Sequence, residues 1–129
     1  IPTGESKKTT STPFDFLSDK IIGDDLNKNN KQLNIAKGYD HCFVLNKGQK
    51  IAAELSELES GRLIQIFTDQ PGIQLYTGNH LKGVFSKNQG LCLETQHFPN
   101  SPNIKSFPST IIKADTDYYS KTSYHFKLI

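Results

Sequence analysis

One carboxylate stands where it could act on a ligand. Glu94 lies in a short apolar strand expected over residues 90–96. On the two-residue period of a strand, it points away from Leu91 and Leu93. A lone glutamate is usually a solvated group at the rim of a fold. The alternative is a partly buried general base, because desolvation raises the pKa of a carboxyl group toward neutrality. The strand pattern leaves both interpretations open.

Other polar side chains stand at expected strand ends or beside turns: Asp40, His41, Gln74, Asn79, Gln96 and His97. An aspartate there commonly caps a turn, and a glutamine amide either bridges strands or orients a ligand. The histidines are expected to be hydrogen-bonded structural residues, and His80 and His125 surface residues. Tyr39 and Tyr76 either offer a face for sugar stacking or belong to the core. Asp40 and Glu94 could also form a glycosidase pair, although their spacing does not require it.

Composition narrows the classes of function. The formal charge of +2 is too small to suggest a nucleic-acid partner. No apolar run approaches the roughly 20 residues that span a bilayer, and no signal-peptide pattern occurs. The sequence has no nucleophile elbow, phosphate loop or metal-ligand spacing. We expect Cys42 and Cys92 to be reduced core thiols of a cytoplasmic protein, with a disulfide as the less favoured alternative.

Short alternating segments between Gly, Pro and Asn turns predict an all-β fold. We expect a turn over residues 38–41 and strands over residues 42–45, 50–58, 62–68, 73–77, 90–96 and 118–128. The last is the most regular, with one face running from Tyr118 to Leu128. Residues 50–58 also suit a helix, because Ala, Glu and Leu favour helices. Gly48 and Gly61 bracket that segment at hairpin distance and favour the strand.

The N-terminal third carries weaker signals. Residues 14–17 are expected to form a short strand or a docking segment. Residues 23–34 are expected to be a polar loop with at most one helical turn, in which only Leu26 and Leu33 can pack. The 129 residues correspond to one domain or a piece of one. Because the chain begins with Ile1 and contains no methionine, we expect it to be part of a longer polypeptide.

Several stretches together resemble one protein family. The main ones are residues 38–45, 70–79 and 92–96, with support from residues 2–5, 12–16 and 107–108. Their order and spacing are similar to those of the C-terminal half of the aldose 1-epimerase (galactose mutarotase) family. The resemblance implies that residues 1–129 are the C-terminal portion of a single large antiparallel β-sandwich domain. It also implies an isomerase that interconverts the α and β anomers of free aldohexoses such as galactose and glucose, without a metal or organic cofactor.

The resemblance also implies roles for three residues. By position, Glu94 matches the general base, Asp40 a carboxylate that binds sugar hydroxyls, and Gln74 a substrate-contacting glutamine. The family's acid histidine lies in the N-terminal half, and no stretch of this chain matches its motif. His41 belongs to the Asp40 motif and is not expected to replace that acid. The segment before Glu94 is also shorter than in the family.

A partner therefore follows from the resemblance. We expect the N-terminal half of the same protein to be needed for stability and activity, since a half-sandwich exposes sheet edges and apolar faces. The alternative function is a non-catalytic carbohydrate-binding module of the same fold.

Overall fold

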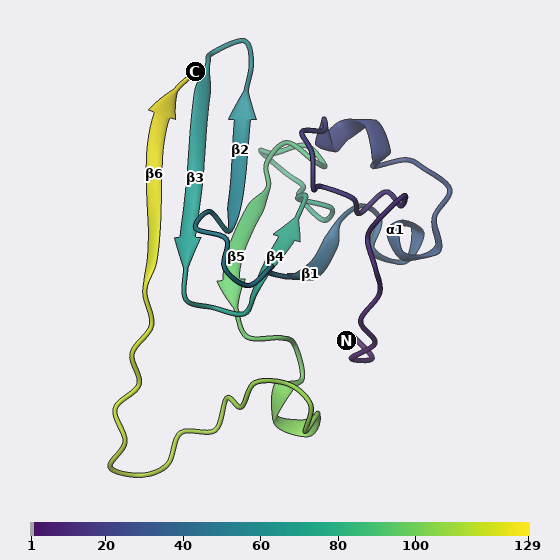
Figure 1. Cartoon of the computed structure of the whole chain (residues 1–129). Helices are drawn as coiled ribbons and strands as arrows, with labels where there is room; N and C mark the ends of the chain where they lie inside the picture. Colours follow the sequence, from purple (N-terminus) through teal and green to yellow (C-terminus); the bar gives the residue numbers. More distant parts are fainter. Residues whose placement is uncertain (1) are drawn as a thin grey trace. The chain divides into compact units, whose positions relative to one another are not determined.

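The computed structural model describes residues 2–129, and strands make up most of its regular secondary structure (Figure 1). In chain order the elements are η1 (Ile22–Asp25), α1 (Lys31–Ala36), β1 (Asp40–Val44), β2 (Ala53–Glu57), β3 (Arg62–Thr68), β4 (Gly72–Tyr76), β5 (Cys92–Gln96), η2 (Ser101–Asn103) and β6 (Thr122–Leu128). The strands form two three-stranded sheets, with the orders β1-β4-β5 and β2-β3-β6. The all-β prediction is confirmed, and each predicted strand overlaps an observed one.

The chain divides into two compact units, which are described separately. The first contains the described residues of Ile1–His41 together with Gln74–Leu93. The second contains Cys42–Ile73 and Glu94–Ile129. Among the described residues, no helix is both long and apolar enough to cross a membrane.

Tyr39 is the centre of the first unit. Its side chain is fully buried, and its hydroxyl donates to the carbonyl oxygen of Pro13 at 2.7 Å. The rings of Phe14 and Phe16 pack edge-on against it, with centroids 5.5 and 5.4 Å away. Burial, and secondarily the charge of Asp25, raises the pKa of Tyr39 to about 12. Of the two alternatives for residues 14–17, the docking segment is therefore correct and the strand is wrong.

A six-residue helix, α1, follows the N-terminal segment. The Asn30 side chain caps it by accepting from the backbone N–H groups of Gln32 and Leu33, at 2.9 and 3.4 Å. It ends at Lys37, which adopts the left-handed conformation with φ 61°. Leu33 is buried, as predicted. Residues 23–34 nevertheless hold more helix than expected, because the cap and the anchored leucine stabilise a segment with little periodicity.

Asp25 packs into the fold, although only the leucines of residues 23–34 were expected to do so. Its side chain is buried although it is charged, and its carboxylate pairs with Lys20 at 2.9 Å and with Lys28. Hydrogen bonds from Lys28 and then Lys20 hold its pKa below the ordinary value. Lys20 also donates to the Pro13 carbonyl at 2.6 Å and lies 4.2 Å from the centroid of the Phe16 ring. The prediction that only two leucines could pack here is wrong, because the lysines compensate the buried charge.

The second unit is organised by antiparallel pairing of β3 with β2 and β6. Ile66 lies opposite Ala53 on β2 and Tyr124 on β6, and it is almost completely buried. At the β2–β3 turn, the Glu57 carboxylate accepts from two following backbone N–H groups, both at 2.8 Å. The strand prediction for residues 50–58 is therefore confirmed over the helix.

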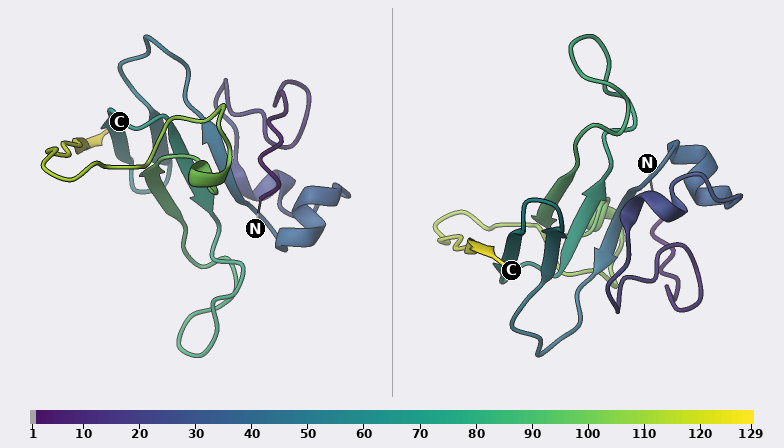
Figure 2. Two further views of the ribbon diagram at one scale, coloured as in Figure 1. Left: turned by 90° about the horizontal axis from the view of Figure 1, so that it is seen from below. Right: turned by 90° about the horizontal axis from the view of Figure 1, so that it is seen from above.

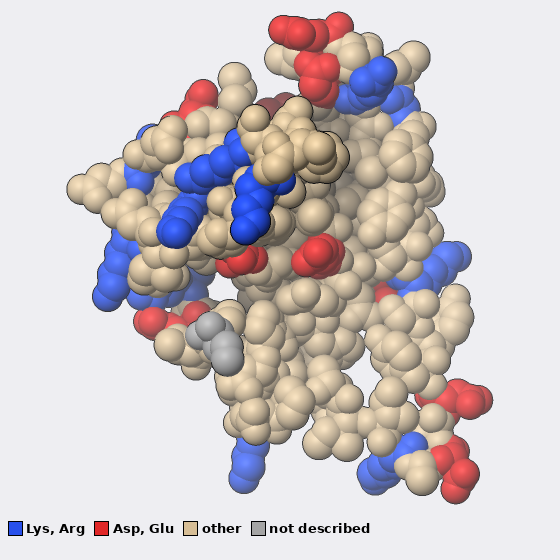
Figure 3. Space-filling view, turned by 180° about the vertical axis from the view of Figure 1, so that it is seen from behind, with Lys and Arg blue, Asp and Glu red and all other residues tan. Residues whose placement is uncertain are grey.

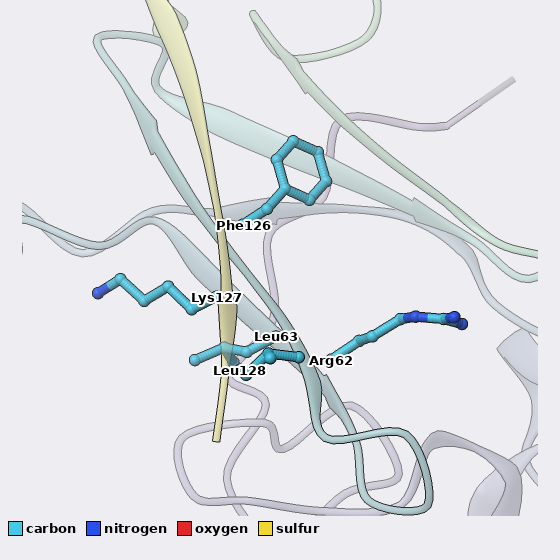
Figure 4. A pocket seen from close by; sticks show the side chains of 5 residues that line it. All are labelled: Arg62, Leu63, Phe126, Lys127 and Leu128. Carbon is cyan, nitrogen blue, oxygen red and sulfur yellow. The ribbon is translucent and has the colours of Figure 1, made fainter.

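The final strand is shorter than predicted. β6 begins at Thr122, whose hydroxyl bonds those of Thr68 and Thr95 at 2.9 and 2.8 Å. Tyr124, Phe126 and Leu128 share one face, as expected, but Phe126 and Leu128 are each 78% exposed. Phe126 and Leu128 line a recess together with Arg62, Leu63 and Lys127 (Figure 4). We call this exposed, edge-strand surface of Tyr124, Phe126 and Leu128 the β6 row.

Charges and thiols complete the description. Figure 3 shows acidic and basic side chains on the same face, with wide uncharged areas beside them.

Both cysteines are free thiols. Cys42 is half-buried, but Cys92 is exposed, so its assignment to the core is wrong. Its position on the same face of β5 as Glu94 accounts for that exposure.

We predict that Leu33→Ala lowers the free energy of unfolding by about 2–5 kcal/mol, because it removes a buried side chain and leaves a cavity. Chemical denaturation measures the change. Ile35→Ala is the matched control, since Ile35 lies on the same helix and is 67% exposed. Equal effects of the two substitutions would contradict the packing described for α1.

We predict that Asp25→Asn lowers the melting temperature at pH 7 and that this difference shrinks at acid pH. A carboxyl group with a lowered folded pKa contributes its stability above the unfolded pKa of about 4, and loses it as the pH falls through the folded value. Thermal melts of both proteins from pH 7 to 3 test this. Asp24→Asn is the control, because Asp24 is exposed. A gap that stays constant to pH 3 would argue against the ion pairs.

Candidate functional site

Asp40 and Gln74 form a side-chain pair in the first unit. Asp40 begins β1, and Gln74 lies in β4, its neighbour in the sheet. The Gln74 Nε2 atom donates to Asp40 Oδ1 at 2.7 Å. Asp40 is exposed and Gln74 half-buried, while Gln74 Oε1 is buried and has no hydrogen-bond partner among residues 2–129. The pair thus keeps acceptor atoms that the described fold does not use.

A buried amide supports the start of β1. Asn79 Nδ2 donates to the carbonyl oxygens of Ala36 and Tyr39, each at 2.8 Å, and Asn79 Oδ1 accepts from the Thr77 hydroxyl at 2.7 Å. The Thr77 hydroxyl in turn accepts from the Tyr39 backbone N–H at 3.0 Å. Gly38 has φ 141°, and a Cβ there would lie 2.2 Å from Asn79 Oδ1. The glycine before Tyr39 is therefore required by both conformation and space.

The loop between β4 and β5 extends away from these strands (Figure 2). Its base is closed by Asn88, whose Nδ2 atom donates to the Thr77 carbonyl at 2.6 Å and to Asn79 Oδ1 at 3.2 Å. Val84 and Phe85, farther out in the loop, are 90% and 56% exposed. The anchored base holds the end of β4 independently of the exposed part of the loop.

His41 contacts Asp40 through the backbone. Its Nδ1 atom accepts from the Asp40 N–H at 3.0 Å. The Phe14 ring lies edge-on to the imidazole, with centroids 4.6 Å apart and an interplanar angle of 67°. Burial lowers the pKa of His41, although the Asp40 charge opposes this shift. These contacts support the expectation that His41 is a structural histidine.

Glu94 is exposed on β5, where its half-buried neighbours Leu93 and Thr95 point to the other face. Within residues 2–129 its side chain makes no hydrogen bond or ion pair. The structure joins Asp40 to Gln74 in the first unit, whereas Glu94 belongs to the second and is described by itself. The Glu94 carboxylate is thus exposed in this chain, and its role as a base stays a prediction.

The remaining histidines have other surroundings. His97 Nδ1 bonds Gln70 Oε1 at 2.7 Å, and Gln70 Nε2 donates to Tyr118 and Ser120, at 3.1 and 2.6 Å. His97 is therefore the hydrogen-bonded structural residue that was expected. His80 and His125 are exposed, also as predicted. Over residues 2–129, no group of three or more His, Cys, Asp or Glu side chains is placed to hold a metal ion.

Two residues that shape the site, Phe14 and Asn88, were not singled out from the sequence. Phe14 follows a Thr-Pro pair, which marks an extended segment but not what it packs against. Asn88 lies among Gly, Lys and Asn residues of a loop, where composition gives no signal for a particular position. The two tyrosines have different surroundings. Tyr39 belongs to the core, whereas Tyr76 is half-buried and its hydroxyl accepts a hydrogen bond from the His80 backbone N–H.

Comparison with known proteins gives a consistent result. Residues 1–125 match the family model described as aldose 1-epimerase. The chain is 36% identical to galactose mutarotase from Sus scrofa, covering 99% of this chain and 39% of that protein. It is 34% identical to aldose 1-epimerase from Escherichia coli strain K12, covering 98% of this chain and 40% of that protein. The chain thus spans about two fifths of the length of these curated relatives.

Solved structures of similar proteins share the fold of this chain. The aldose epimerase homologue from C. elegans superimposes with a TM-score of 0.87 at 25% identity, covering 99% of this chain and 40% of its own. Galactose 1-epimerase from Lactobacillus acidophilus gives a TM-score of 0.68 at 34% identity, covering 74% of this chain and 30% of its own. The predicted fold class, part of a large antiparallel β-sandwich of the galactose mutarotase type, is confirmed.

We predict that Asn79→Ala lowers the free energy of unfolding by about 2–3 kcal/mol, because two buried carbonyl groups lose their donor. Urea denaturation measures the loss. Asn34→Ala is the control, because the Asn34 side chain bonds only the exposed Asn29. A near-zero effect at Asn79 would mean that water replaces the amide and that it does not support β1.

Proposed function

Because the chain belongs to the aldose 1-epimerase family, we propose that it supplies part of the active site of an isomerase acting on free aldohexoses such as galactose and glucose. The observation that carries the proposal is the Asp40–Gln74 pair, in which acceptor atoms remain unused at a position that the family resemblance assigns to sugar binding. Glu94, an exposed carboxylate on β5, has no structural role in the described residues that would account for it.

In this proposal Asp40 and Gln74 bind the sugar. Pyranose hydroxyls are hydrogen-bond donors, and a carboxylate is the strongest neutral-pH acceptor among side chains, worth about 1.5–3 kcal/mol per bond. Gln74 fixes one carboxylate oxygen and leaves Oδ2 for a hydroxyl. The orphaned Gln74 Oε1 would gain a donor from a ligand or from the rest of the domain, which removes the cost of an unsatisfied buried acceptor.

Glu94 is the proposed general base. It takes the proton from the anomeric hydroxyl, the C1–O bond to the ring oxygen breaks, and an acid delivers a proton to that oxygen. The product is the open-chain aldehyde. Rotation about C1–C2 followed by reclosure, with both protons returned, gives the other anomer. The acid is needed because the ring oxygen would otherwise leave as an alkoxide.

The acid is proposed to come from the N-terminal half of the same protein. His41 Nδ1 accepts a backbone hydrogen bond and His97 Nδ1 is bound to Gln70, which are the contacts of structural histidines. The chain's share of two fifths of its relatives' length supports a missing contributor. The same segment would supply the partner surface for the β6 row and the desolvation that Glu94 needs.

The free thiols of Cys42 and Cys92 support a cytoplasmic location.

A second candidate is a carbohydrate-binding module without catalysis. The exposure of Glu94 favours it for this chain alone, because no described side chain stands beside the carboxylate to take part in a proton transfer. Such a module would bind galactose, detected by ligand-observed NMR, without accelerating its mutarotation.

We predict that Glu94→Gln in the intact protein reduces the rate of anomer exchange by about 10²–10⁴-fold, because it removes the general base. Polarimetry of freshly dissolved α-galactose measures the rate. Glu59→Gln is the control, since Glu59 is an exposed carboxylate in the β2–β3 turn. Near-normal turnover by Glu94→Gln would refute the assigned role, and galactose binding without exchange by the unaltered protein would favour the binding module.

A further inference from the structure

We propose that His41 is a positioning residue whose Nδ1 atom holds the backbone N–H of Asp40 and so fixes the direction in which the Asp40 carboxylate faces a ligand. The ligand part of this inference rests on the proposed function, because it takes Asp40 to contact the sugar. The structural part stands on contacts within the first unit alone.

Asp40 is held at two points. The His41 Nδ1 atom accepts its backbone N–H at 3.0 Å, and Gln74 Nε2 binds its carboxylate Oδ1 at 2.7 Å. An aspartate side chain has only two rotatable bonds, so a fixed backbone and one fixed oxygen leave Oδ2 a single direction. Without the His41 contact, the first residue of β1 has one fewer restraint at the strand end.

The contact selects one form of the imidazole. An Nδ1 atom that accepts a hydrogen bond carries no proton, so the ring is neutral and its proton is on Nε2. Burial acts in the same direction, because it disfavours the charged ring and lowers the pKa of His41. His41 therefore acts here as a neutral acceptor and not as a proton donor at Nδ1.

The N-terminal segment holds the ring. Phe14 packs edge-on against His41, with centroids 4.6 Å apart, and also edge-on against the buried Tyr39, at 5.5 Å. The preceding residue, Pro13, is fixed because its carbonyl accepts from both Tyr39 and Lys20. A segment remote in sequence from Asp40 therefore determines the orientation of the ring that holds it.

The first test is the tautomer of His41 in the unaltered chain, read from long-range ¹H–¹⁵N correlations of the imidazole at pH 7.5. The proposal expects a protonated Nε2 and an unprotonated, hydrogen-bonded Nδ1. A protonated Nδ1 would overturn it, because that atom could not accept from Asp40. The measurement needs no substitution, so it decides the matter even if a variant fails to fold.

The second test compares His41→Asn with His41→Leu by amide hydrogen exchange at Asp40. Asparagine can accept the backbone N–H through Oδ1, whereas leucine cannot. Loss of a typical hydrogen bond should speed exchange in His41→Leu by roughly threefold to tenfold, and His41→Asn should stay near the unaltered rate. His80→Leu, at an exposed histidine of the same unit, is the control. Unchanged exchange in His41→Leu would refute the contact.

The third test uses the intact protein and galactose binding by calorimetry. The proposal expects His41→Leu to weaken binding by roughly threefold to tenfold and His41→Asn to restore it. Binding that is equal in all three proteins would overturn the positioning role while leaving the proposed function intact. No binding by the unaltered protein would instead refute the proposed function, and the tautomer and exchange results would still decide the contact with Asp40.

Discussion

Tyr39 is fixed at both of its ends inside the first unit. Its backbone N–H and carbonyl bind Thr77 and Asn79, and its phenol donates to the carbonyl of Pro13. Burying a hydroxyl in this way is favourable only because it keeps a partner. Since Tyr39 directly precedes Asp40, these contacts also set where β1 begins and where its first carboxylate lies. The docked N-terminal segment and the candidate site thus depend on one buried side chain.

Alternation of apolar and polar residues was enough to predict the strands, because a sheet face repeats every two residues whatever lies around it. Features that depend on which particular side chains meet were not predictable in the same way. Asp25 reads as a loop residue, and its burial depends on two lysines that surround it. The pattern that continues back to Tyr118 also misled, because Gln70 binds Tyr118 and Ser120 outside the sheet.

The candidate site was only partly accessible from sequence. Residue types and turns marked Asp40, Gln74 and Glu94 as candidates, but their roles came from family resemblance. The structure adds that Asp40 and Gln74 bind each other directly, a relation between residues 34 positions apart that no local pattern contains. For Glu94 the limit is physical: its surroundings depend on groups outside the described residues, which leave its side chain exposed.

Because the β6 row is exposed, the concentrations of the chain and of any partner determine what the chain associates with. An edge strand with exposed apolar side chains can pair with another copy of the same chain or with a different partner. Pairing between copies accelerates with the square of the chain's concentration, whereas pairing with a partner depends on the product of the two concentrations. The concentration of the chain relative to that of a partner therefore sets which product dominates. Through the exposed Phe126 and Leu128, the concentration of the chain itself becomes a variable in what it associates with.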